Sequence, residues 1–133
     1  MLAGKLRVER VLGEGGMGIV VLAHHLALDQ PVAVKLIHPH LLEHDEIRER
    51  FEREARAAAK LQSEHVARVL DVDVLEDGVP YIVLEYLEGR SLEDVLSEDG
   101  RLPIETAADY LVQALDAVVE AHARGIVHRD LKP

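Results

Sequence analysis

Four glycines within six residues make one segment of this chain well suited to holding a phosphate group. The segment follows the pattern G-x-G-x-x-G-x-V, and its residues are Gly13, Glu14, Gly15, Gly16, Met17, Gly18 and Val20. Glycine has no Cβ, so its backbone amides can approach phosphate oxygens closely. A glycine-rich hairpin turn has a similar pattern, and this segment alone leaves both interpretations open. A dinucleotide-binding loop is excluded, because it should open a helix, and strand-forming residues 19–22 follow instead.

A lysine and a glutamate in otherwise apolar surroundings are the next candidates. The strand period of two places Lys35 with Ala33 and Ile37, in a strand whose faces are otherwise apolar, so its ammonium group needs a partner charge or a phosphate. In the helix predicted next, Glu54 falls within the apolar arc. The other members of this arc are Ile47, Phe51, Ala55, Ala58 and Leu61. We therefore expect Glu54 to pair with Lys35. The alternatives are a lysine that extends into solvent from an edge strand and a solvated glutamate at the border of the arc.

A sheet and a helix must position these residues. Alternating and β-branched residues predict strands over 5–12, 18–26, 31–37, 69–75 and 79–86. Asp77 and Gly78 predict the turn between the last two strands. A helix is predicted over 46–62, with the charge pairs Glu46–Arg50, Glu49–Arg53 and Glu52–Arg56. Further helices are predicted over 91–97 and 103–124, the second ending at Gly125.

Composition limits the class of function. With 133 residues, of which 48% are hydrophobic and 30% charged, the chain is expected to be globular and soluble. The net charge of −10 argues against a nucleic-acid partner. No metal ligands are predicted in this chain, because cysteine is absent and His38, His40 and His44 are interpreted as solvated loop histidines. No signal peptide or membrane segment is found, so a cytoplasmic location is expected, with an anchor beyond residue 133 left open.

The order and spacing of five motifs resemble the eukaryotic-type serine/threonine protein kinases of bacteria. Besides the glycine segment, the motifs are residues 32–35 (Val-Ala-Val-Lys), 51–55 (Phe-Glu-Arg-Glu-Ala), 81–86 (Tyr-Ile-Val-Leu-Glu-Tyr) and 128–133 (His-Arg-Asp-Leu-Lys-Pro). The resemblance implies an α+β, protein-kinase-like fold. Residues 1–88 would form the N-lobe, with a five-stranded antiparallel sheet, one helix and the hinge. Residues 89–133 would begin the helical C-lobe and end inside the catalytic loop.

The resemblance also implies a role for each motif residue. ATP would bind at the glycine segment, with Lys35 at its α- and β-phosphates and paired to Glu54. Adenine would be enclosed by Leu12, Val20 and Ala33. The gatekeeper would be Leu84, and the hinge backbone groups would come from Glu85 and Leu87. In the catalytic loop, Asp130 would be the base, and Lys132 is typical of serine/threonine specificity.

Phosphoryl transfer to a serine or threonine of a protein substrate also needs Mg²⁺. Its expected ligands, an Asn and the Asp of Asp-Phe-Gly, belong beyond residue 133, so we expect these 133 residues to lack kinase activity by themselves. The alternative is a short non-catalytic module that binds nucleotide or another kinase. The presence of Lys35, Glu54 and Asp130 favours the kinase, because a binding module has no physical need for all three.

Overall fold

The computed structural model describes residues 1–129 and 131–133, which form two compact units. The first unit comprises Met1–Lys60 and Ala67–Tyr86, and the second comprises Leu61–Val66 and Leu87–Pro133. Each unit has its own internal organisation and is described by itself.

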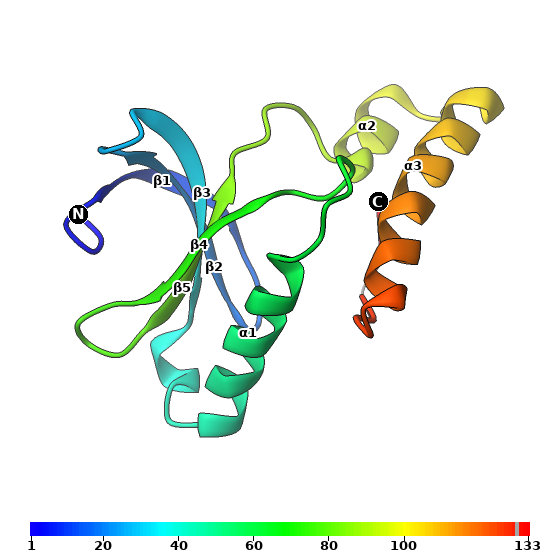
Figure 1. The fold of residues 1–133 in the computed structure, drawn as a ribbon. Helices are drawn as coiled ribbons and strands as arrows, with labels where there is room; N and C mark the ends of the chain where they lie inside the picture. The colour runs from blue at the N-terminus through cyan, green and yellow to red at the C-terminus, as the bar shows by residue number, and fades with distance from the viewer. Residues whose placement is uncertain (130) are drawn as a thin grey trace. The chain divides into compact units, whose positions relative to one another are not determined.

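The first unit is a five-stranded antiparallel sheet with one α-helix (Figure 1). The strands are β1 (Leu6–Glu14), β2 (Gly18–His25), β3 (Gln30–Ile37), β4 (Val69–Val74) and β5 (Pro80–Glu85), in the spatial order β1-β2-β3-β5-β4. A short 3-10 turn, η1 (Pro39–Leu41), follows β3 and leads into α1 (Asp45–Ala58). The predicted α+β class, with five antiparallel strands and one helix, is confirmed.

Each face of the sheet has its own apolar cluster, as the period of two in the strands requires. One cluster consists of Leu6, Val21, Ala23, Val32, Val34, Tyr81 and Val83. On the opposite face, Phe51 and Ala55 of α1 pack with Ile37 and Ile82. The register aligns Val21 with Val34 and Val34 with Val83, so the first cluster crosses three neighbouring strands.

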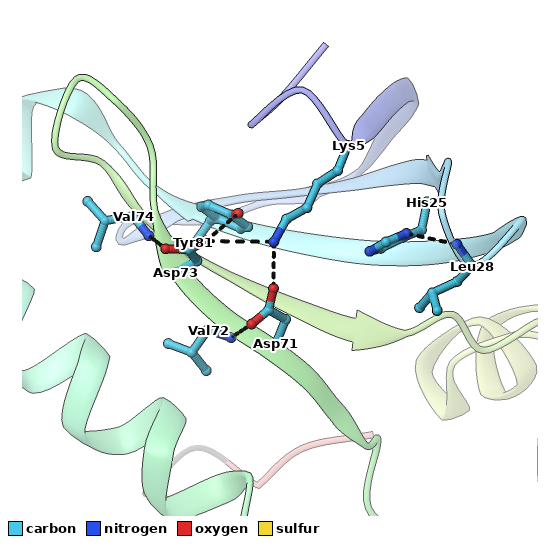
Figure 2. Close-up of polar contacts among 8 residues, drawn as sticks. All are labelled: Lys5, His25, Leu28, Asp71, Val72, Asp73, Val74 and Tyr81. Carbon is cyan, nitrogen blue, oxygen red and sulfur yellow. Dashed lines mark hydrogen bonds and ion pairs between the residues drawn. The ribbon is translucent and has the colours of Figure 1, made fainter.

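Lys5, directly before β1, connects the two edge strands of the sheet (Figure 2). Its Nζ lies 2.7 Å from Oδ2 of Asp71 and 3.6 Å from Oδ2 of Asp73, both on β4. The same ammonium group lies 5.9 Å from the centre of the Tyr81 ring. Because β1 and β4 are at opposite edges in the strand order, this contact requires the sheet to curl around the first apolar cluster. We call this group of four residues the Lys5 clasp.

The clasp changes the ionisation of its members. The hydrogen bond from Lys5 to the Asp71 carboxylate raises the lysine pKa above its ordinary value. The pKa of Asp73 is lowered, mainly because its carboxylate accepts a hydrogen bond from the Val74 amide, and burial raises the pKa of Tyr81. The charged forms of Lys5 and Asp73 are therefore the ones that the fold stabilises.

Local hydrogen bonds close the β4–β5 turn and the β2–β3 turn. Gly78 has a φ of 88° and donates its amide to the Leu75 carbonyl, as a hairpin turn at Asp77-Gly78 requires. In the turn between β2 and β3, the Leu28 amide donates to Nδ1 of His25 over 3.2 Å (Figure 2). The predicted turn at residues 77–78 is confirmed.

The helix α1 is shorter than predicted. It ends at Ala58, whereas the sequence pattern predicts a helix to residue 62. The Gln62 and Ser63 amides each donate over 2.7 Å to the carboxylate of Glu120, which lies on α3. Residues 61–66 belong to the same second unit as α3. A side chain remote in sequence thus takes up amides that a longer helix would bond internally.

The second unit contains α2 (Leu92–Asp99) and α3 (Ile104–Ala123). Ser91 and Asp94 form a reciprocal capping box at the start of α2. Gly125, with a φ of 76°, follows the α3 C-cap, and its amide donates to the His122 carbonyl, so the predicted helix end is confirmed. Several large apolar side chains along α3 are exposed; they are Ile104, Leu111, Val112, Leu115 and Val119.

Candidate functional site

The glycine segment forms the connection between β1 and β2 and leaves open space around three of its glycines. The Gly15 amide donates to the Gly18 carbonyl over 2.9 Å, which closes the turn. A Cβ added at Gly13, Gly15 or Gly16 would meet no atom within 4 Å. No neighbouring atom therefore crowds the side-chain position of these three glycines.

Gly18 has a different role from the other three glycines. A Cβ at this position would lie 2.0 Å from the Leu36 carbonyl oxygen, because Gly18 pairs with Ile37 at the start of the β2–β3 ladder. Contacts this short to backbone are not tolerated, so this glycine allows the two strands to approach. The sequence motif does not distinguish it from its neighbours.

His38 holds the glycine segment from the end of β3. Its Nε2 lies 2.8 Å from the Gly15 carbonyl oxygen, and its backbone amide donates to the Met17 carbonyl over 3.1 Å. Its side chain is only 18% exposed, so the interpretation of His38 as a solvated loop histidine is wrong. The strand register explains this position, because extending the β2–β3 pairing by one residue past Gly18 and Ile37 brings Met17 beside His38.

Three of the residues expected around a nucleotide base, Val20, Ala33 and Leu84, share one face of the sheet. The strand register places Val20 opposite Lys35, and Ala33 opposite both Leu22 and Leu84. Paired residues of neighbouring strands lie on the same face, which is the face that carries Ile37 and Ile82. Leu12 on β1 is half-buried, as are Val20 and Leu84. The structure therefore brings an apolar strip and one lysine together beside the open glycines.

Lys35 is exposed, although the strand pattern predicts a buried position. In the part of the chain that the structure describes, no ion pair of Lys35 is formed. An exposed ammonium group retains its hydration, so the cost of burying an unpaired charge does not arise. The lysine is available to a ligand anion.

Glu54 is also exposed, and its carboxylate accepts from Nε of Arg50 over 2.9 Å. The predicted burial of Glu54 on the apolar arc is wrong. The predicted arc includes Glu54 only because Leu61 lies on the far side of it around the helix. Since α1 ends at Ala58, Leu61 is not part of the helix, and the remaining apolar residues span a narrower arc that excludes Glu54. Of the predicted charge pairs along α1, Glu52–Arg56 is formed at 3.5 Å, whereas Arg50 pairs with Glu54 instead of Glu46.

The end of β5 carries the expected hinge residues. The Glu85 amide donates to the Arg68 carbonyl, and the Glu85 carboxylate accepts from the Arg68 amide, so this side chain closes the β4–β5 pair. The amide of Glu85 is thus occupied within the sheet. Leu87, two residues on, is 65% exposed and belongs to the second unit.

The expected catalytic loop is described only in part. Asp130 lies outside the described residues. Lys132 is exposed and lines a hollow of about 330 Å³ together with Glu93, Leu96 and Ser97 of α2 and with Pro133. Among the described residues, no group of three or more His, Asp or Glu side chains is arranged to hold a metal ion.

Comparison with known proteins assigns the whole arrangement to one family. The family model described as "Protein kinase domain" matches residues 6–133. The serine/threonine-protein kinase pkn3 of Myxococcus xanthus is 41% identical over 132 residues, which are 99% of this chain and 24% of that protein. PksC of Streptomyces coelicolor is 42% identical over 140 residues, covering 100% of this chain and 25% of that protein. The chain thus spans about a quarter of the length of these relatives.

Solved structures agree with the sequence comparison. The kinase domain of Mycobacterium tuberculosis PknI has a TM-score of 0.83 and 31% sequence identity to this chain, and the match covers 100% of the chain and 54% of that domain. None of the helices described here is long and apolar enough to cross a membrane.

Proposed function

The chain belongs to the protein kinase domain family, and from this premise we propose that its first unit binds ATP and that the whole protein phosphorylates serine or threonine side chains of other proteins. Family membership makes it a serine/threonine protein kinase by class. The activity, the substrate and the division into an N-lobe at 1–88 and a C-lobe beginning at 89 are proposals, because the chain spans only part of each relative.

One observation carries the proposal: Lys35 of β3, unpaired in the described chain, lies on the same sheet face as an apolar strip and opposite Val20, close to where β2 leaves the open glycines. Apolar side chains suit a purine ring, and backbone amides with one ammonium group suit a phosphate chain. The residues present fit ATP in both respects. The bound nucleotide would supply the phosphoryl group.

We assign the residues as follows. Leu12, Val20 and Ala33 enclose the adenine, with Leu84 as gatekeeper. The hinge contacts come from the Glu85 carbonyl and the Leu87 backbone. Gly13, Gly15 and Gly16 provide the backbone that approaches the phosphates, together with Glu14 and Met17 of the same turn. Lys35 neutralises phosphate charge, and Glu54 is its partner once Arg50 releases the carboxylate.

Asp130 is assigned as the base that receives the substrate hydroxyl proton, and Lys132 as the residue beside it that favours serine and threonine. The ligands expected for Mg²⁺ are not among these 133 residues, and positioning plus charge neutralisation supply most of the catalysis in this class. We therefore propose that the 133 residues alone bind ATP without transferring phosphate.

Calorimetric titration of the 133-residue chain with ATP tests the binding site. We expect Lys35→Ala to weaken binding at least about tenfold, whereas Lys60→Ala, an equal loss of charge at an exposed lysine that is not assigned to the site, should leave it unchanged. Equal affinities for wild type and Lys35→Ala would refute the assignment. Transfer of labelled phosphate to casein by these 133 residues would refute the proposed inactivity.

A further inference from the structure

Few contacts of the described chain hold the glycine segment to the rest of the sheet. Its glycines carry no side chains, and positions 13, 15 and 16 have no neighbour within 4 Å of an added Cβ. Within the turn, the Gly15 amide is bonded to the Gly18 carbonyl. The side-chain hydrogen bond to the backbone of this segment comes from His38, which contacts the Gly15 carbonyl over 2.8 Å.

The geometry of His38 makes this contact a defined one. A carbonyl oxygen only accepts hydrogen bonds, so Nε2 carries a proton and donates it. The ring stacks on that of His40, with centroids 5.4 Å apart and an interplanar angle of 20°, and the backbone amide of His38 is bonded to Met17. The Glu14 carboxylate lies 3.8 Å from the same Nε2. The imidazole is thus held on several sides.

The consequence for the loop follows from the planarity of the peptide bond. The Gly15 carbonyl and the Gly16 amide belong to one trans peptide plane and point in opposite directions. When His38 fixes the carbonyl, the Gly16 N–H is fixed in the direction away from the imidazole, and a Cβ added at Gly16 would meet no atom within 4 Å. Glycine otherwise allows such a plane to rotate with little restraint.

We propose that His38 is a positioning residue for the nucleotide: it holds the Gly15–Gly16 peptide so that the Gly16 amide stays directed at a bound phosphate. This inference rests on the proposed function, because it assumes that the glycine segment receives a phosphate chain. His38, which lies outside the glycine motif, would thus orient a backbone amide that the glycines alone leave free to rotate.

Titration with two ligands tests the proposal. ATP carries the phosphates, and adenosine lacks them. We expect His38→Leu to weaken ATP binding about five- to tenfold and to change adenosine binding less than twofold. His38→Gln, which keeps an N–H donor near the position of Nε2, should restore most of the ATP affinity. His44→Leu is the matched control, because His44 is an exposed histidine before α1 whose side chain makes no capping hydrogen bond.

Amide hydrogen exchange without nucleotide tests whether His38 restrains the glycine segment. His38→Leu should accelerate exchange at Gly15 and at residue 38 and leave Val34 in the core strand unchanged.

If wild type binds no ATP, the proposed function fails, and the phosphate-directed role of His38 fails with it. If wild type binds ATP but His38→Leu binds it equally well, or loses ATP and adenosine affinity together, the proposed function stands and the inference about His38 is overturned.

Discussion

Nε of Arg50 lies 2.9 Å from a carboxylate oxygen of Glu54, one helical turn further along α1. This pair occupies the carboxylate that the family resemblance assigns to Lys35. Both side chains are about half exposed, and exposed pairs at this spacing contribute only about 0.3–0.5 kcal/mol. The pairing is therefore weak enough for a stronger partner to replace.

A double-mutant cycle tests whether Arg50 competes with Lys35 for Glu54. In wild type we expect Glu54→Gln to change ATP affinity less than threefold, because the carboxylate is bound to Arg50. In an Arg50→Gln background the same substitution should weaken ATP binding more strongly. Calorimetry on the four chains measures the coupling. Identical effects of Glu54→Gln in both backgrounds would exclude the competition.

The Lys5 clasp should contribute measurably to stability. Lys5→Met keeps most of the side-chain length and removes the charge, so we expect the free energy of unfolding to fall by about 0.5–1 kcal/mol, a range that allows for partial exposure and solvent screening. Urea unfolding measures the change. Lys60→Met is the control, since Lys60 is exposed and makes no ion pair within the described residues.

The clasp should also weaken in acid. The pKa of Asp73 is lowered in the folded chain, so its contribution is present above the unfolded carboxyl value and is lost as the pH falls through the folded value. Stability should thus decrease on acidification in wild type and decrease less in Asp73→Asn. Unfolding midpoints measured at neutral pH and at successively lower pH test this; parallel curves for the two chains would contradict it.

Gly18 and Gly16 should respond differently to alanine. At Gly18 the new Cβ would lie 2.0 Å from the Leu36 carbonyl oxygen, so the β2–β3 ladder must separate. We expect a loss of about 2 kcal/mol or more. Gly16→Ala meets no atom within 4 Å and should change stability by less than about 0.5 kcal/mol while weakening ATP binding. Thermal unfolding and titration together distinguish the two glycines.

Glu120 should protect the backbone amides of Gln62 and Ser63 from hydrogen exchange. Hydrogen bonds from the Gln62 and Ser63 amides lower the pKa of this carboxyl, so the bonded, charged form persists below the ordinary glutamate range and is lost only on further acidification. We expect Glu120→Ala to accelerate exchange of both amides. Asp116→Ala, which removes only the contact to the Ser63 hydroxyl, should leave the Gln62 amide protected.

The sequence by itself determined the order and type of the elements and the position of the glycine segment. Strand period, turn residues and helix caps act over a few neighbouring residues, so Asp77-Gly78, Gly125 and the alternation of residues 31–37 could be interpreted without a structure. The same local patterns place Lys35 on a strand with Ala33.

Tertiary structure decided which side chains meet. The Lys5–Asp71 contact joins residues 66 apart in the chain and depends on the curl of the sheet, and His38 reaches Gly15 across 23 residues through the β2–β3 register. The helix α1 ends at Ala58, and the Gln62 and Ser63 amides that follow it are bound by the carboxylate of Glu120, which lies on α3. Such contacts follow from the packing of whole elements, and no local period of residue types encodes them.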